Sequence, residues 1–190
     1  MNAFEWLYGC MVVLMFGFFA PVHFKIKGSP VSIRQAGIKD ARDLNRIVNE
    51  KKVSDFLSFT PPVPLSLTKR KIAETLKNRN QKWLVMKYGG RIAGSIILRR
   101  GSGPSMHTAE FGIAFSGEFQ GKGLAAWLLK TAFAYLKKNR VRLLHAQVVA
   151  GNRQARKFYE KLGFKECGEI PLFFRRGNKF LPMVFVAKAL

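Results

Sequence analysis

The spacing of apolar residues along the chain changes repeatedly between a period of two, typical of strands, and the wider spacing of amphipathic helices. Strands are predicted at Val31–Ala36, Trp83–Tyr88, Arg91–Arg99, 108–115, Leu143–Val149, Phe164–Phe174 and Lys179–Ala187. Helices are predicted at Asp40–Lys52, Ser66–Asn80, 121–138 and Gln154–Leu162. The pair Gly89-Gly90 indicates a hairpin, and Ser54–Leu65, with three prolines, indicates a loop. Strands and helices therefore alternate along most of the chain.

The first 28 residues follow a different pattern, because they are apolar at nearly every position. From Trp6 to Ala20 there is no charge, and as far as Phe24 only one proline and one histidine interrupt the stretch. As a helix, Trp6 to Phe24 would span about 28 Å, close to the hydrocarbon thickness of a bilayer. Glu5 precedes the stretch and only basic residues follow it closely, which predicts that the rest of the chain faces the cytoplasm.

Residues 1–28 are therefore predicted to be a transmembrane anchor, and residues 29–190 a single domain associated with the membrane and facing the cytoplasm. Two alternatives stay open. Translation could begin nearer Val31, which would give a soluble cytoplasmic protein, or the apolar segment could be a helix that contacts a partner protein. Cys10 and Cys167 are far apart and indicate no disulfide framework, and no metal-ligand cluster is predicted.

The chain is strongly basic, with 33 lysines and arginines against 11 acidic residues and a formal net charge of +22. An excess of this size attracts polyanions. Because an apolar anchor is predicted beside the basic domain, an anionic membrane surface is the expected partner. No aromatic-interleaved RNA motif or helix-turn-helix pattern indicates sequence-specific nucleic-acid binding. The sequence leaves open whether the protein forms a homodimer.

The segment Gln120–Ala125, Q-G-K-G-L-A, lies between the apolar strand 108–115 and the apolar helix that follows. Glycines on both sides of a lysine at the start of a helix leave backbone N–H groups without intrahelical partners. These donors and the positive end of the helix dipole suit a phosphate group. Alone the signal is weak, because many strand–helix junctions use glycine merely to turn.

A second motif follows about 30 residues later, where Asn152 precedes a helix that reads A-R-K-F-Y-E-K-L-G-F from Ala155 to Phe164. Together with Gln120–Ala125, it resembles the two signatures of the GNAT superfamily of acetyl-CoA-dependent N-acetyltransferases. The segment from Ala109 to Ala125, A-E-F-G-I-A-F-S-G-E-F-Q-G-K-G-L-A, is most similar to sequences of the branch that contains ribosomal-protein alanine and spermidine acetyltransferases. The resemblance covers roughly residues 31–188.

This resemblance implies a mixed α+β GNAT fold, with a central, mostly antiparallel twisted sheet of six to seven strands and helices on both faces. Two neighbouring parallel strands should splay apart and admit acetyl-CoA as co-substrate. Backbone near Ile113, Ala114 and Phe115 should polarise the thioester carbonyl and pair with pantetheine. The pyrophosphate should lie over the motif residues Gln120, Gly121, Lys122, Gly123, Leu124 and Ala125.

The resemblance also assigns roles to two residues of the second motif. Tyr159 matches the tyrosine that protonates the departing thiolate, a role that suits a phenol because it is neutral at pH 7 and can donate. The alternative is an aromatic ring that only packs the helix against the sheet. Asn152 matches the residue that hydrogen-bonds the cofactor arm; it could equally be the helix N-cap, and both roles are compatible.

Two residues are candidates for the general base that removes the proton of the amine. Glu110 matches the glutamate of the A-E-[IF]-G pattern in this branch, and His107 lies near the start of the same strand. Their spacing puts them on opposite faces, so at most one is expected to face the cleft. We favour Glu110, directly or through water; its alternative is a surface carboxylate paired with a neighbouring arginine.

The sequence thus predicts an enzyme, an N-acetyltransferase in which a small-molecule or peptide amine attacks the thioester of acetyl-CoA directly. The alternative is a catalytically weak GNAT-fold module that binds CoA or an anionic surface. The acceptor itself is not predicted. With only 11 acidic residues in the chain, a polyamine is disfavoured, and an anionic or zwitterionic amine suits the charge better.

Overall fold

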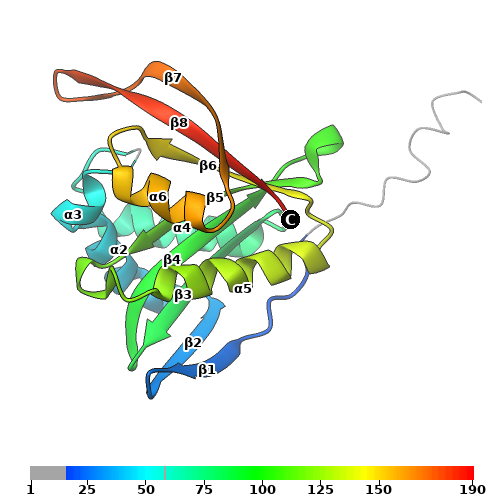
Figure 1. Ribbon diagram of the computed structural model, residues 1–190. Helices are drawn as coiled ribbons and strands as arrows, with labels where there is room; N and C mark the ends of the chain where they lie inside the picture. Colours follow the sequence, from blue (N-terminus) through cyan, green and yellow to red (C-terminus); the bar gives the residue numbers. More distant parts are fainter. Residues whose placement is uncertain (1–15, 58) are drawn as a thin grey trace, which may run out of the picture.

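In the computed structural model, residues 16–57 and 59–190 are described, and they form an eight-stranded sheet in the order β1-β2-β3-β4-β5-β6-β8-β7 (Figure 1). The strands are β1 (Val22–Ile26), β2 (Ser29–Gln35), β3 (Gln81–Tyr88), β4 (Arg91–Arg100), β5 (Thr108–Phe115), β6 (Leu143–Val149), β7 (Lys165–Arg176) and β8 (Lys179–Ala189). The helices are α2 (Ala41–Asn49), α3 (Lys51–Ser54), α4 (Leu65–Lys77), α5 (Leu124–Lys138) and α6 (Arg153–Lys161). This is the mixed α+β architecture that the resemblance implies, with one strand more than expected.

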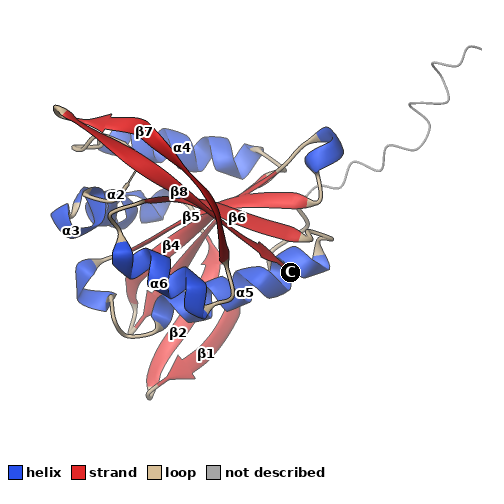
Figure 2. Cartoon of the chain, turned by 45° about the horizontal axis from the view of Figure 1, so that its top comes forward, coloured by secondary structure: helices blue, strands red, loops and turns tan. Residues whose placement is uncertain are grey.

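The helices cover both faces of the sheet (Figure 2). On one face, Leu44 and Ile47 of α2 and Ile72 of α4 pack against Trp83 and Val85 of the sheet. On the other face, a larger core joins α5 and α6 to the sheet. The amphipathic spacing of apolar residues in each helix produces this arrangement, because it gives each helix one face to bury. The sheet therefore separates two hydrophobic cores, one on each face.

Residues 16–24 contradict the predicted membrane-spanning helix from Trp6 to Phe24. Phe16 and Phe19 are 5% and 4% exposed, and the Phe19 ring lies edge-on to Tyr135 of α5 at 5.2 Å between centroids. The Tyr135 hydroxyl donates a hydrogen bond to the carbonyl of Gly17 (2.7 Å). Phe16 and Phe19, which hydropathy assigns to lipid, are therefore core residues of the domain, whereas Phe18 between them is exposed.

The end of the same segment forms the additional strand of the sheet, since β1 pairs antiparallel with β2 along its whole length. No helix in the described ranges, 16–57 and 59–190, is long and apolar enough to cross a membrane. The rest of the predicted anchor, residues 1–15, lies outside the described residues.

Helix α2 starts at a buried ion pair. The Asp40 carboxylate accepts two hydrogen bonds from the Arg34 guanidinium, both 2.7 Å, and one from the backbone N–H of Gly37 (2.8 Å). Burial acts to raise the pKa of Asp40, but these hydrogen bonds and the charge of Arg34 outweigh it and lower that pKa. Asp40 precedes the helix as the sequence indicates, yet its side chain fixes the turn before α2 and forms no hydrogen bond to the first turn of the helix.

Strands β5 and β6 are the parallel pair, and they separate after a short contact. Their pairing joins Thr108–Glu110 to Leu143–His145 and goes no further. Beyond that point β5 continues beside β4 to Phe115, while β6 continues beside β8 to Val149. The predicted splay of two neighbouring parallel strands is thus present, and it opens the sheet beside the segment that leads into α5.

Candidate active site

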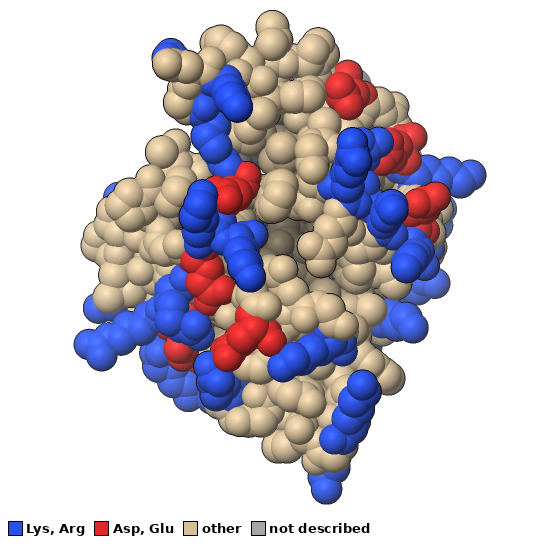
Figure 3. Space-filling view, turned by 60° about the vertical axis from the view of Figure 1, so that its left-hand side comes forward, with Lys and Arg blue, Asp and Glu red and all other residues tan. Residues whose placement is uncertain are grey.

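A cavity of about 1020 Å³ opens where β5 and β6 separate. Its lining comes from two groups of elements. The start of α5, the end of β6 and α6 form one side. Helices α2, α3 and α4, with Leu57 and residues 59–64, form the other side; β3, β4 and β5 lie between them, and β8 contributes Met183. The face of the molecule nearest α3 and the β7–β8 hairpin is hollowed near its centre, and charged side chains surround the hollow (Figure 3).

Among the described residues, the edge of β5 along this cavity has backbone groups without a protein partner, apart from the Phe115 carbonyl, which the Gln120 side chain occupies. Ser116 N–H donates to Ala93 and Gly101 N–H donates to Thr108, so the even-numbered residues of β5 exchange hydrogen bonds with β4. By alternation, the N–H and C=O groups of Ile113 and Phe115 point away from β4, toward the space that β6 has left. Of the three residues predicted to contact pantetheine, these two present their backbone to the cavity. Ala114 directs its backbone to β4 and only lines the cavity.

The loop before α5 has the backbone conformation that its glycines permit. Gly121 and Gly123 have φ values of +74° and +75°, in the left-handed region that favours glycine. In the described part of the chain, no protein group accepts a hydrogen bond from the N–H groups of Gly121–Ala125. Donors without a protein partner at the positive end of α5 are the arrangement that an anion site needs; the binding of a pyrophosphate here stays a prediction of the motif.

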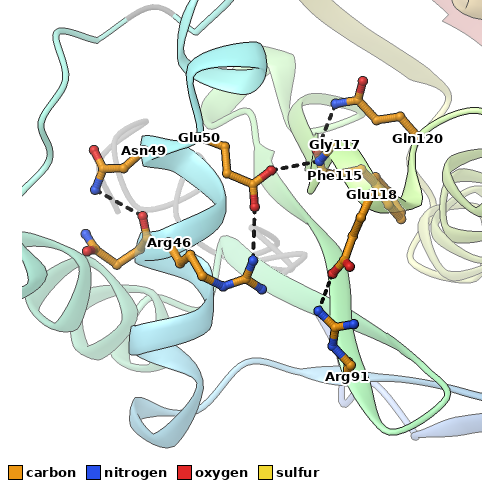
Figure 4. Close-up of polar contacts among 9 residues, drawn as sticks. Arg46, Asn49, Glu50, Arg91, Phe115, Gly117, Glu118 and Gln120 are labelled. Atoms are coloured by element: carbon orange, nitrogen blue, oxygen red, sulfur yellow. Dashed lines mark hydrogen bonds and ion pairs between the residues drawn. The ribbon is translucent and has the colours of Figure 1, made fainter.

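Two side chains shape the same loop. The Gln120 amide donates to the Phe115 carbonyl (3.0 Å), which holds the loop against the end of β5 (Figure 4). The Lys122 ammonium lies over the Phe119 ring, 5.2 Å from its centroid, and Lys122 does not line the cavity. Lys122 therefore adds positive charge near the anion site but points elsewhere.

The opposite wall is fixed to this loop by one carboxylate. Glu50, at the junction of α2 and α3, accepts hydrogen bonds from the backbone N–H of Gly117 (2.7 Å) and from Arg46 (3.1 Å) (Figure 4). Gly117 belongs to the turn between β5 and the anion site. A single side chain thus sets the distance between the α2–α3 wall and the segment that leads into α5.

Asn152 is the N-cap of α6, and its side-chain oxygen accepts a hydrogen bond from Ala155 N–H (3.0 Å). The helix-capping alternative is therefore correct. Asn152 also lines the cavity, so its amide NH₂ remains available to a ligand. Both roles considered from the sequence are compatible with the geometry.

Tyr159 is 6% exposed and lies among aromatic side chains, edge-on to Phe111 at 5.5 Å between ring centroids. Tyr159 therefore packs helix α6 against the sheet, as the alternative from the sequence predicts. Its hydroxyl has no hydrogen-bond partner in the described part of the chain, and the residue lines the cavity. Burial raises the pKa of the Tyr159 phenol, so the group stays protonated at neutral pH.

The two candidates for the general base lie in different surroundings. Glu110 is half-buried and lines the cavity, and within residues 16–57 and 59–190 its carboxylate has no hydrogen-bond or ion-pair partner. Arg99 lies directly opposite Glu110 on β4, but the two do not form an ion pair. His107 is exposed and does not line the cavity. Of the two, only Glu110 is in reach of a bound substrate.

Sequence reasoning missed the residues of the sheet that share a face with Glu110. Register places Arg99 opposite Glu110, Ile97 opposite Gly112, and Trp83 opposite Ile97, so these side chains point toward α2 and α4. Phe111 and Tyr159 lie in the core on the other face. The cavity therefore connects a carboxylate on one face of the sheet to a phenol on the other, through the gap beside β5.

The comparisons with known proteins agree with this geometry. No curated protein matches the chain by sequence. Among solved structures, the ribosomal-protein-alanine N-acetyltransferase of Brucella melitensis superposes with a TM-score of 0.74 at 23% identity, over 83% of this chain and 99% of that one. The spermidine N-acetyltransferase of Vibrio cholerae, solved with CoA and spermine, superposes with a TM-score of 0.76 at 19% identity, over 84% of this chain and 95% of that one.

A third similar structure is a putative acetyltransferase from Salmonella typhimurium solved with its cofactor acetyl-CoA, with a TM-score of 0.74 at 18% identity, over 84% of this chain and 93% of that one. At these identities the likeness shows the fold alone. The model of the acetyltransferase (GNAT) family matches residues 48–164, more than half of the chain, and covers α3 to α6 with all the cavity strands except β8. The chain belongs to the GNAT family of acetyltransferases.

Proposed function

We propose that this protein is an N-acetyltransferase that transfers the acetyl group of acetyl-CoA to a primary amine by direct attack on the thioester. The observation that carries the proposal is the connected cavity. Within the described ranges it has backbone donors without a protein partner at Gly121–Ala125 and at the β5 N–H groups of Ile113 and Phe115, and two unpartnered acid–base side chains. Family membership alone leaves the reaction open, since one fold hosts many functions.

The donor side of the cavity supports acetyl-CoA as the co-substrate. The N–H groups of Gly121–Ala125 suit the pyrophosphate, and Lys157 and Lys161 of α6 add positive charge along the same side. The backbone of Ile113 and Phe115 suits the amide groups of pantetheine, which would pair with β5 as an added strand. The CoA-bound structures of two fold relatives are consistent with a ligand of this size in the fold.

The acceptor side supports amine attack. In the proposed reaction the Glu110 carboxylate takes the proton of the amine, directly or through water, and the nitrogen attacks the carbonyl carbon. A backbone N–H of β5 near Ile113 stabilises the oxyanion. The carbon–sulfur bond then breaks, and the Tyr159 phenol gives its proton to the sulfur, which leaves the acetylated amine and free CoA.

The alternative function is a module that binds CoA without efficient transfer. The test is to incubate the purified full chain with acetyl-CoA and a panel of primary amines while free thiol is measured, and to measure acetyl-CoA binding by calorimetry. Amine-dependent thiol release supports the enzyme. Binding with no release for any amine supports the CoA-binding module, and absence of binding contradicts both.

A further inference from the structure

The cavity has a distinct half for the acceptor, here called the acceptor chamber, which lies between the sheet and the α2–α4 side. Apolar side chains form most of its wall: Val48, Val53, Leu57, Leu67, Trp83 and Ile97. Trp83 is 6% exposed and Ile97 is half-buried, so the floor of the chamber is largely apolar. A ligand that fills this space gains from the burial of an apolar body.

The charged side chains of the acceptor chamber are mostly basic. Lys52, Lys71 and Arg99 line it, and none of them has a carboxylate partner among residues 16–57 and 59–190. The basic residues next to two of them in the chain lie outside the cavity and do have carboxylate partners: Lys51 pairs with Asp55, and Arg70 pairs with Glu74. Glu110 is the sole acidic residue among the described residues that line the cavity.

Glu110 and Arg99 lie directly across from each other on two antiparallel strands, and both side chains are on the chamber face. They belong to a hydrogen-bonded pair, in which the Cα atoms are about 5.5 Å apart. A carboxylate and a guanidinium at this spacing can contact an amine and an anion of one small molecule at once. A molecule with several ammonium groups would meet one carboxylate and three unpaired cations.

The geometry points to an acceptor that is a small amphipathic zwitterion. Its primary amine lies at Glu110, an anionic group close to the amine pairs with Arg99, and an apolar side chain fills the acceptor chamber. Lys71, whose ammonium is 5.8 Å from the centroid of the Phe59 ring at the rim, supports the same charge preference. This inference rests on the proposed acetyl transfer and adds the class of acceptor to it.

The test compares acceptors that differ in one group. The full chain with saturating acetyl-CoA is assayed with phenylalanine, its phosphonate analogue, 2-phenylethylamine, glycine, spermidine and a basic peptide with a free N-terminus. We expect kcat/KM for phenylalanine or the phosphonate to exceed that for 2-phenylethylamine and for glycine at least tenfold. The two anionic analogues distinguish a carboxylate from a phosphorus acid as the preferred anion. Preference for spermidine, the peptide or 2-phenylethylamine would overturn the inference.

Charge variants locate the selectivity within the acceptor chamber. In Arg99→Gln we expect the ratio of kcat/KM for phenylalanine to that for 2-phenylethylamine to fall about tenfold, because a charge-assisted hydrogen bond is lost. Lys71→Gln should lower the ratio by a smaller factor. The matched controls are Arg42→Gln and Lys69→Gln, which replace exposed basic residues outside the cavity and should leave the ratio unchanged. An unchanged ratio in Arg99→Gln would contradict the assignment.

A binding measurement separates this inference from the proposed function. The thermal unfolding midpoint of the CoA-saturated chain is measured with each amine, since a ligand that binds only the folded state raises it. If no amine is acetylated but phenylalanine or its phosphonate raises the midpoint more than 2-phenylethylamine does, the proposed function fails and the acceptor class stands. If an amine is acetylated but neither zwitterion is preferred, the proposed function stands and the acceptor class fails.

Discussion

The two halves of the cavity are built in different ways. The donor half uses backbone groups of nearly consecutive residues, the β5 edge and the loop Gly121–Ala125. The acceptor chamber uses side chains that come from α2, α3, α4, β3, β4 and β5. Backbone N–H groups can bind a ligand whichever side chains most of their residues have. A chamber lined by side chains, by contrast, changes its ligand specificity when those side chains are substituted. Substitutions should therefore change the preferred acceptor more readily than the donor.

Glu110 and Tyr159, the two residues proposed to act as base and acid, lie at the boundary of the two halves. Loss of Tyr159 should have the largest effect there. Tyr159→Phe keeps the aromatic packing against Phe111 but removes the proton that the sulfur needs. We expect kcat to fall about 100-fold with little change in KM for acetyl-CoA, as for loss of a general acid. Thiol release under saturating substrates measures this.

Tyr135 is a matched control, because it is also buried in the core and burial raises its pKa. Its hydroxyl donates to Gly17, far from the cavity lining, so Tyr135→Phe should reduce stability but leave kcat within about twofold. The raised pKa of Tyr159 also predicts that wild-type kcat does not fall as the pH rises to about 10, the ordinary value for a tyrosine. Equal kcat for wild type and Tyr159→Phe would remove the residue from the mechanism.

Loss of Glu110 should have the next largest effect, on the acceptor side of the boundary. Glu110→Gln is nearly isosteric and removes the proposed base, so we expect kcat/KM for the amine to fall about 10- to 100-fold at pH 7. The deficit should shrink as the pH rises, because more of the amine is then unprotonated in solution. A pH profile of kcat/KM measures this.

Glu74→Gln is the control for Glu110→Gln, since Glu74 is exposed and pairs with Arg70 outside the cavity. It should follow the wild-type profile. A Glu110→Gln profile parallel to that of the wild type at every pH would show that the carboxylate does not act as the base.

The lining of the donor half could be predicted from sequence, because it comes from short segments that can be recognised in the chain. Two short motifs have a fixed spacing that can be recognised in the sequence: Gln120–Ala125, and Asn152 followed by Tyr159. All of these residues except Lys122 line the cavity. The α-helices and strands were also predicted, apart from β1 and from α3, which the sequence merged with α2 and the loop after it. The packing of Phe16 and Phe19 was missed as well. There hydropathy cannot distinguish a core segment such as Phe16 and Phe19 from a membrane segment, since both are apolar.

The acceptor chamber could not be predicted in the same way, and one irregularity shows why. The two-residue turn Gly89-Gly90 pairs Tyr88 with Arg91, which would place Trp83 opposite Ile96. A register shift between Met86 and Lys87 instead places Trp83 opposite Ile97, on the chamber face. One inserted residue in a strand moves every side chain beyond it to the opposite face of the sheet. No feature of the sequence indicates where such an insertion lies.

Substitution of a loop glycine should affect the donor half selectively. Gly123→Ala forces a Cβ into the left-handed region at φ +75°, which costs about 1–2 kcal/mol and disturbs the N–H groups at the start of α5. We expect KM for acetyl-CoA to rise about tenfold and the acceptor preference to stay unchanged. Gly90→Ala is the control, because Gly90 has φ +83° in the β3–β4 turn and lies outside this cavity. Equal KM values in both variants would show that strain, and not the anion site, causes any loss of activity.

The smallest effect should come from the contact that holds the outer wall of the acceptor chamber. The guanidinium of Arg176, at the end of the β7–β8 hairpin, donates to the carbonyls of Asp55 and Leu57 and so ties the hairpin to the segment after α3. Arg176→Ala frees this segment, and we expect KM for the amine to rise about three- to fivefold, the equivalent of one modest hydrogen bond. KM for acetyl-CoA should stay unchanged, because the donor half does not include these residues.

Arg175→Ala is the matched control, since Arg175 donates to Gly177 within the turn of its own hairpin. If Arg176→Ala raised both KM values together, the two halves would be coupled through the hairpin, and their separation into independent sites would be wrong.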